Sequence, residues 1–157
     1  IANDGILVKP QIVEKMTNTD TGEVTEFKTE EVRQVISKET ADKVTSMMES
    51  VVTEGSGQRA IVQGYSIGGK TGTSEPRENV DEGYTASFLA ISPVENTQIV
   101  LLVILKNPGP GVNHNGGVIA APTASKMLAE ILPYMGVESG NNNTTTNANN
   151  LSEEDLY

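Results

Sequence analysis

The longest apolar run of the sequence, residues 99–105, contains no polar residue. It is too short to cross a bilayer, which takes about 20 residues of helix, and its Val, Ile and Leu residues favour a β-strand. Residues 84–91 form a second predicted strand, and the short turn at residues 92–98 makes the two strands antiparallel. Because every position of 99–105 is apolar, we expect both faces of that strand to be covered.

A β-hairpin is predicted nearer the start of the chain. Residues 11–17 and 23–27 resemble two strands joined by a turn at residues 20–22. Residues 31–36 are too short and mixed to assign. The hairpin and the later strand pair indicate antiparallel β-structure.

Two helices are predicted beside these strands. Ser37 is a favourable N-cap for a helix with one apolar face, and Gly55 is expected to close it. A second helix is predicted at residues 119–133, with Pro122 near its first turn, where proline is tolerated. The fold class is therefore α+β.

Length and composition exclude several functions. A chain of 157 residues favours one domain, and a net charge of −10 argues against nucleic-acid binding. With one histidine and no cysteine, a zinc site within this chain is not expected. The chain begins at Ile1 without a signal peptide, which suggests a piece of a longer protein. Residues 138–157 are Asn/Thr-rich and acidic, and are predicted to be a disordered tail or linker.

The segment Lys70-Thr71-Gly72-Thr73 combines a cation, two hydroxyls and side-chain-free backbone. In a strand, Lys70 and Gly72 lie on one face and the two threonines on the other. At a sheet edge, Lys70 can reach around the strand, and the Thr73 N–H could serve as an oxyanion donor. Lys70 could attract a carboxylate or hold a proton relay, and either role requires it to be partly buried.

A phosphate-binding loop is the main alternative for this segment. Residues 64–71 match its pattern literally, but a polar loop precedes them and Pro76 follows, whereas a P-loop joins an apolar strand to a helix. His114, in a Pro/Gly/Asn-rich loop, and Arg59 are interpreted as surface residues without a role.

The residues Gly68 to Thr73 resemble the Lys-Thr-Gly motif of the penicillin-binding serine acyltransferases. Flanking segments are similar to those around this motif in class B penicillin-binding proteins, and the resemblance spans residues 1–137. These segments are residues 4–10, 55–57, 60–69, 84–93 and 116–122.

The resemblance implies the C-terminal half of a peptidoglycan D,D-transpeptidase domain, with a serine β-lactamase/transpeptidase-like fold. Lys70 and Thr73 would be catalytic, and Thr71, Gly72 and Thr73 would bind the substrate carboxylate. The substrates would be peptidoglycan stem peptides, and β-lactams would bind the same site. The resemblance implies no metal or organic cofactor. The protein would act at the outer face of the bacterial cell membrane, through an anchor outside this chain.

The family also requires a Ser-x-x-Lys and a Ser-x-Asn motif. This sequence has no Ser-x-x-Lys, and its Ser139-Gly140-Asn141 lies in the predicted tail, after the third motif instead of before it. We therefore expect the nucleophile in a missing N-terminal half, carried by the same or a separate chain. This chain alone is expected to be inactive and stable only with that half. A serine β-lactamase fragment and a non-catalytic penicillin-binding or sensor module are the alternatives.

Overall fold

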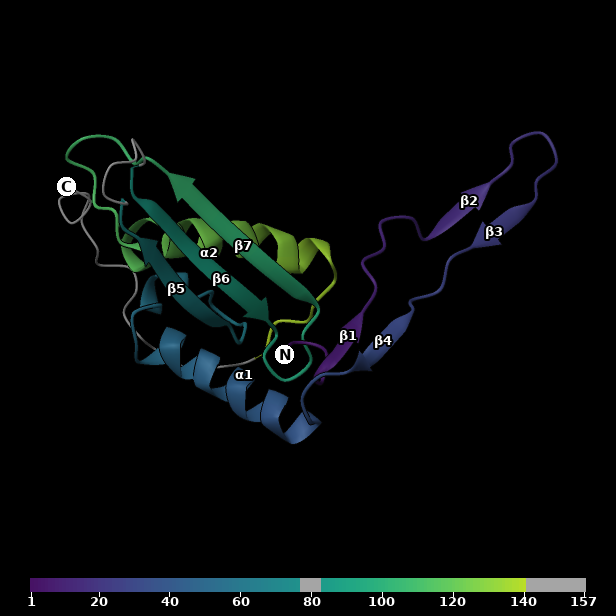
Figure 1. The fold of residues 1–157 in the computed structure, drawn as a ribbon, viewed down its shortest axis with the longest axis horizontal. Helices are drawn as coiled ribbons and strands as arrows, with labels where there is room; N and C mark the ends of the chain where they lie inside the picture. The colour runs from purple at the N-terminus through teal and green to yellow at the C-terminus, as the bar shows by residue number, and fades with distance from the viewer. Residues whose placement is uncertain (77–82, 141–157) are drawn as a thin grey trace. The chain divides into compact units, whose positions relative to one another are not determined.

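The computed structural model describes residues 1–76 and 83–140 (Figure 1). These residues divide between Val44 and Thr45 into two compact units. The elements, in chain order, are β1 (Ile6–Val8), β2 (Lys15–Thr17), β3 (Val24–Glu26), β4 (Glu31–Gln34), α1 (Lys38–Thr53), the 3-10 helix η1 (Gln58–Ala60), β5 (Gly68–Ser74), β6 (Thr85–Ser92), β7 (Ile99–Lys106) and α2 (Gly116–Tyr134).

The first unit consists of two antiparallel ribbons. Strands β2 and β3 pair around the predicted turn, where the Asn18 side chain accepts N–H groups of Asp20 and Thr21 at 2.9 and 3.2 Å. The predicted hairpin is therefore confirmed, with shorter strands than expected. Strands β1 and β4 form the second ribbon, so the unassigned residues 31–36 contain a strand that sequence alone did not identify.

Helix α1 begins where the sequence predicts. The Ser37 hydroxyl accepts the N–H of Thr40 at 3.2 Å, which is the expected N-cap bond. The helix ends at Thr53, two residues before Gly55, within the usual uncertainty of a helix boundary.

The second unit is built on a three-stranded antiparallel sheet in the order β5-β6-β7. Helix α2 lies against one face of this sheet (Figure 1). The β6 side chains on that face, Ala86, Phe88 and Ala90, are fully buried, and Leu128 and Leu132 of α2 are equally buried. Most of the core therefore lies between the sheet and α2, and Val52, Ala60, Val62 and Ile67 belong to the same buried cluster.

The face of β7 that points away from α2 is about half exposed within the part of the chain that the structure describes. Val100, Leu102 and Ile104 are 54%, 54% and 51% exposed, whereas Val103, on the α2 side, is 7% exposed. The expectation that both faces of this strand are covered is wrong for this structure. The physical reason is that α2 covers one face only, and side chains alternate between faces.

Helix α2 begins three residues earlier than predicted. Asn115 is its N-cap and accepts the N–H of Gly117 at 2.8 Å, which a range starting at residue 119 does not include. No helix in residues 1–76 or 83–140 is long and apolar enough to cross a membrane.

The chain after α2 is tied to the segment that leads into β5. The Tyr65 hydroxyl donates to the Val137 carbonyl at 3.3 Å, and the Gly140 N–H donates to the Gly64 carbonyl at 2.9 Å. Residues 141–157 of the predicted tail lie outside the described residues.

Candidate active site

The motif Lys70-Thr71-Gly72-Thr73 lies in β5, at one edge of the three-stranded sheet. The strand continues to Ser74 and pairs with β6 along its whole length. A phosphate-binding loop would instead leave its strand before the lysine and open a helix there. The structure therefore excludes the P-loop interpretation and gives the edge strand that the sequence predicted.

Both threonine hydroxyls of the motif lie on the same side of β5, as the strand alternation predicted. The Thr71 hydroxyl is 3.1 Å from the hydroxyl of Ser56, and either can be the donor. The Thr73 hydroxyl accepts the backbone N–H of Gly116 at 3.2 Å. These contacts bring together residues that are 15 and 43 positions apart in the chain.

Gly69 lets β5 pack closely over the core. A Cβ atom at this position would lie 2.3 Å from Cζ of Phe88 and 2.9 Å from the Leu89 carbonyl oxygen. Phe88 is fully buried, so its ring fills the space that any side chain at position 69 would need. The glycine before the motif lysine is therefore required by packing against β6.

Lys70 is exposed, and its amine donates to the carbonyl of Thr71 at 2.7 Å. The side chain therefore lies along its own strand and bonds to the next residue, as an edge position allows. The partial burial that its predicted roles require is therefore absent among residues 1–76 and 83–140.

A cavity of about 270 Å³ lies beside the threonine side of the motif. Ser56, Arg59 and Val118 are among its lining residues. The Arg59 side chain is half-buried, and its guanidinium donates to the Val118 carbonyl at 3.5 Å. Arg59 is therefore a wall of this cavity rather than the free surface residue that the sequence suggested.

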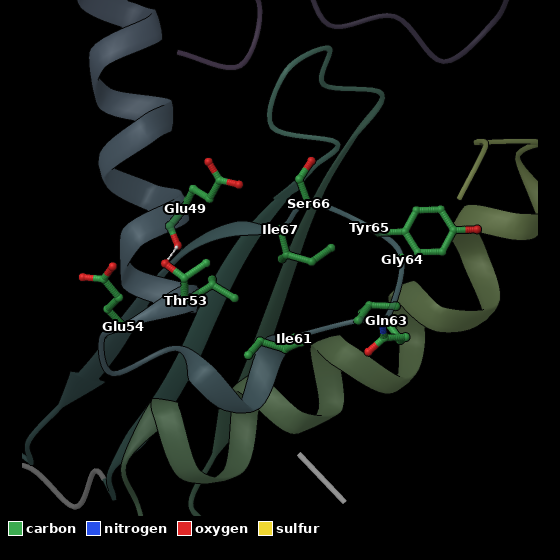
Figure 2. A pocket seen from close by; sticks show the side chains of 11 residues that line it. Glu49, Thr53, Glu54, Ile61, Gln63, Gly64, Tyr65, Ser66 and Ile67 are labelled. Atoms are coloured by element: carbon green, nitrogen blue, oxygen red, sulfur yellow. Dashed lines mark hydrogen bonds between the residues drawn. The ribbon is translucent and has the colours of Figure 1, made fainter. Parts of the chain in front are cut away.

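A second cavity, of about 280 Å³, is lined by α1 and the segment before β5 (Figure 2). Glu49, Glu54, Ile61 and Tyr65 are among its lining residues, and none of the motif residues is. This groove is therefore separate from the Lys-Thr-Gly segment.

His114 stacks on the ring of Tyr84, with ring centroids 3.8 Å apart and an angle of 20° between the planes. This contact links the segment before α2 to the start of β6. The structure thus gives His114 a packing contact with Tyr84.

Ser56 and Gly116 are the partners of the two threonine hydroxyls, and the sequence alone did not single them out. Both lie in glycine-containing segments that carry the family resemblance, Gly55-Ser56-Gly57 and Gly116-Gly117. The resemblance marked these segments, but a backbone N–H bond to a strand 43 positions away leaves no signal in residue types.

The comparisons with known proteins agree on one family. A family model described as the penicillin-binding protein transpeptidase domain matches residues 1–129. Stage V sporulation protein D of Bacillus subtilis is 36% identical over 113 residues, covering 70% of this chain and 17% of that protein. Penicillin-binding protein PbpB of Mycolicibacterium smegmatis is 34% identical over 144 residues, covering 84% of this chain and 22% of that protein.

Solved structures have the same fold. The D,D-transpeptidase domain of a peptidoglycan glycosyltransferase from Eggerthella lenta has a TM-score of 0.73 and 27% identity, covering 87% of this chain and 30% of that one. Penicillin-binding protein 3 from Mycobacterium tuberculosis, complexed with ampicillin, has a TM-score of 0.74 and 29% identity, covering 90% of this chain and 34% of that one.

The chain thus spans less than a quarter of the length of the two curated relatives above and about a third of the solved domains. Its fold is α+β and matches that of these transpeptidase domains, with antiparallel strands and two helices. On the family match and these likenesses, the chain belongs to the penicillin-binding protein transpeptidase domain family.

Proposed function

We propose that this chain is the C-terminal part of a peptidoglycan D,D-transpeptidase, which cross-links stem peptides by serine acyl transfer. The observation that carries the proposal is the Lys-Thr-Gly-Thr strand at the sheet edge, with both threonine hydroxyls on one side, in a chain of this family. The relatives that are named by their activity are D,D-transpeptidases, which favours acyl transfer over the hydrolysis of β-lactams.

The reaction has two steps that share one site. A serine oxygen attacks the penultimate D-Ala carbonyl, the C–N bond breaks and D-Ala leaves with a proton on its amine. An amine of a second stem peptide then attacks the acyl-serine ester, forms the new amide and returns the proton to the serine. A β-lactam acylates the same serine when its ring amide opens.

The residues of β5 would supply one wall of that site. The hydroxyls of Thr71 and Thr73, on one side of the strand, would donate to the terminal carboxylate of the substrate. The absent side chain at Gly72 would let the substrate backbone approach. The Thr73 N–H would stabilise the oxyanion, a kind of contact that in other enzymes contributes about 3–4 kcal/mol. Lys70 would place its positive charge in the proton-transfer network.

The serine and its lysine base would come from an N-terminal half outside this chain. Two features of the second unit are consistent with such a partner. The apolar side of β7 is half exposed at Val100, Leu102 and Ile104, and the outer edge of β7 is unpaired within the described residues. An exposed apolar edge strand is prone to pair with another chain. In the complete domain, strands of the N-terminal half would pair with the edge of β7, and other parts of that half would cover its apolar side.

The site would lie on the outer face of the bacterial cell membrane, where peptidoglycan is assembled. The membrane anchor would be in sequence outside this chain. The relatives include a stage V sporulation protein and proteins named peptidoglycan D,D-transpeptidase FtsI, which supports a role in building the cell wall.

A labelled penicillin tests the proposal. The protein carrying both halves of the domain should form a long-lived acyl-enzyme on a serine outside this chain, whereas this chain alone should remain unlabelled. Rapid turnover of the label would instead indicate a β-lactamase. A complete protein that is not labelled at all would contradict both the transpeptidase and the β-lactamase interpretations.

Substitution of the motif lysine tests its role in the same assay. Lys70→Ala should slow acylation about 100-fold or more, the range of a residue that takes part in proton transfer. Lys106→Ala, which removes another exposed strand lysine, is the matched control and should acylate at the wild-type rate. Equal rates for both variants would remove Lys70 from the mechanism.

A further inference from the structure

The N-terminus of α2 contacts the motif strand through one backbone group. The N–H of Gly116 donates to the Thr73 hydroxyl oxygen at 3.2 Å, across 43 positions of sequence. The next two N–H groups of α2 are bonded locally: Gly117 donates to the Asn115 side chain at 2.8 Å, and Val118 to the Asn115 carbonyl at 2.9 Å. Gly116 therefore differs from the next two residues, because its N–H donates to a side chain of β5 and theirs donate to the N-cap residue Asn115.

The identity of residue 116 allows this contact. A Cβ atom at Gly116 would lie 2.3 Å from the Ser87 carbonyl oxygen and 2.5 Å from the Gly72 carbonyl oxygen. Both neighbours are backbone atoms of paired strands, so neither can move aside without disturbing the sheet. Any other residue at position 116 would push the end of α2 away from Thr73.

The hydrogen bond from the Gly116 N–H determines whether the Thr73 hydroxyl can act as a donor toward a ligand. A hydroxyl has one hydrogen and two lone pairs. Because the Gly116 N–H takes one lone pair, the hydroxyl hydrogen is directed elsewhere, and the described part of the chain offers it no acceptor. The partial positive charge at the start of a helix also strengthens the hydroxyl as a donor. At Thr71 the partner is the Ser56 hydroxyl, which can donate or accept.

We propose that Gly116 is a positioning residue for the transpeptidase reaction: its N–H holds the Thr73 hydroxyl as a donor toward the carboxylate of the substrate. The proposal rests on the proposed function, in which Thr73 contacts that carboxylate. Gly116 itself touches no substrate; it acts through Thr73. Loss of the Gly116 N–H should therefore slow acylation by ligands that carry a carboxylate. Acylation by ligands without that charge should proceed as before.

An amide-to-ester replacement at Gly116 tests this without adding a Cβ. Glycolic acid incorporated at position 116 puts an oxygen in place of the N–H and keeps the glycine shape. The same replacement at Gly117, whose N–H caps the helix, is the matched control. Both are made in the complete transpeptidase protein, and acylation rates are measured with benzylpenicillin and with its methyl ester, which lacks the negative charge.

The ester at position 116 should slow acylation by benzylpenicillin about tenfold, because the Thr73 hydroxyl is no longer held as a donor to the charged carboxylate and that charge-assisted hydrogen bond is weakened. Acylation by the methyl ester should change less than about threefold, and the ester at position 117 should leave the ratio of the two rates as in the wild type. In a Thr73→Val background, the replacement at 116 should have no further effect, since residues acting as one unit are not additive.

Equal losses for the two penicillins, or full additivity with Thr73→Val, would show that Gly116 acts on the fold and would overturn the proposal. Thermal melting of each variant monitors the fold directly. Failure of the proposed function gives a different result, because the wild-type protein would then not be acylated by either penicillin.

Discussion

The packing of Gly69 over Phe88 makes a quantitative prediction about stability. In Gly69→Ala, the new Cβ would lie 2.3 Å from the tip of the Phe88 ring and 2.9 Å from the Leu89 carbonyl oxygen. The ring is fully buried between the sheet and α2, so it has no free space to move into. Relief of the contact therefore requires a shift of the strand or an unfavourable ring rotamer.

Overpacking of this kind costs about 1–3 kcal/mol in well-packed cores. With a urea m-value of about 2 kcal/mol/M, the unfolding midpoint of the domain should fall by about 0.5–1.5 M. Gly109→Ala is the matched control. Its Cβ would meet no atom within 4 Å, so its midpoint should stay the same or rise slightly, since alanine restricts the unfolded chain.

Phe88→Leu identifies the cause of the loss. Leucine has no atom at the Cζ position, so Gly69→Ala should cost less in a Phe88→Leu background, with a coupling energy of about 1 kcal/mol or more in the double-mutant cycle. Urea curves for the four proteins, followed by circular dichroism, measure it. The same cost in both backgrounds would refute the argument that the ring demands a glycine at position 69.

Three further predictions concern the face of β7, an ion pair and the core. Leu102→Lys places a charge on the half-exposed side of β7 and should weaken association with the N-terminal half about tenfold or more, because burying an unpaired charge is costly; unchanged binding by titration calorimetry would contradict a partner on this face. Hydrogen bonds to Asp4 and then Asp42 raise the pKa of Lys38 above its ordinary 10.5, so their contribution is fully present below pH 10.5 and is lost as pH rises through the folded value. The difference in melting temperature between wild type and Lys38→Met should therefore shrink above pH 10.5, and a constant difference would argue against the pairing. Leu132→Ala, at a fully buried position of α2, should lower the free energy of unfolding by about 2–5 kcal/mol in urea titrations, and a loss below 1 kcal/mol would argue against a tight core there.

Local patterns predicted most of the secondary structure. The turn at residues 20–22, the N-cap Ser37 and the strand pair around residues 92–98 are each specified by neighbouring residues, and each is present. The β1–β4 pairing was missed because its partners are about 25 residues apart and both strands are short and exposed. Apolar content alone also gave the wrong burial for β7, since α2 covers only one of its faces in the described part of the chain.

The motif could be located from sequence, but its contacts could not. Side-chain alternation placed Thr71 and Thr73 on one side and Lys70 on the other, as the structure has them. The partners Ser56 and Gly116 reach the strand from distant loops, one through a small side chain and the other through its backbone. The roles of these residues in catalysis remain predictions for the experiments above.

The two threonine contacts differ in how evolution can alter them. The partner of Thr71 is the Ser56 side chain, so one codon change can lengthen, weaken or remove that contact. The partner of Thr73 is a backbone N–H at a position where every side chain would collide with two strands. Natural variants that tune the binding of carboxylate ligands should therefore accumulate at position 56, while changes at position 116 should be rare and arise together with compensating changes in β5 or β6.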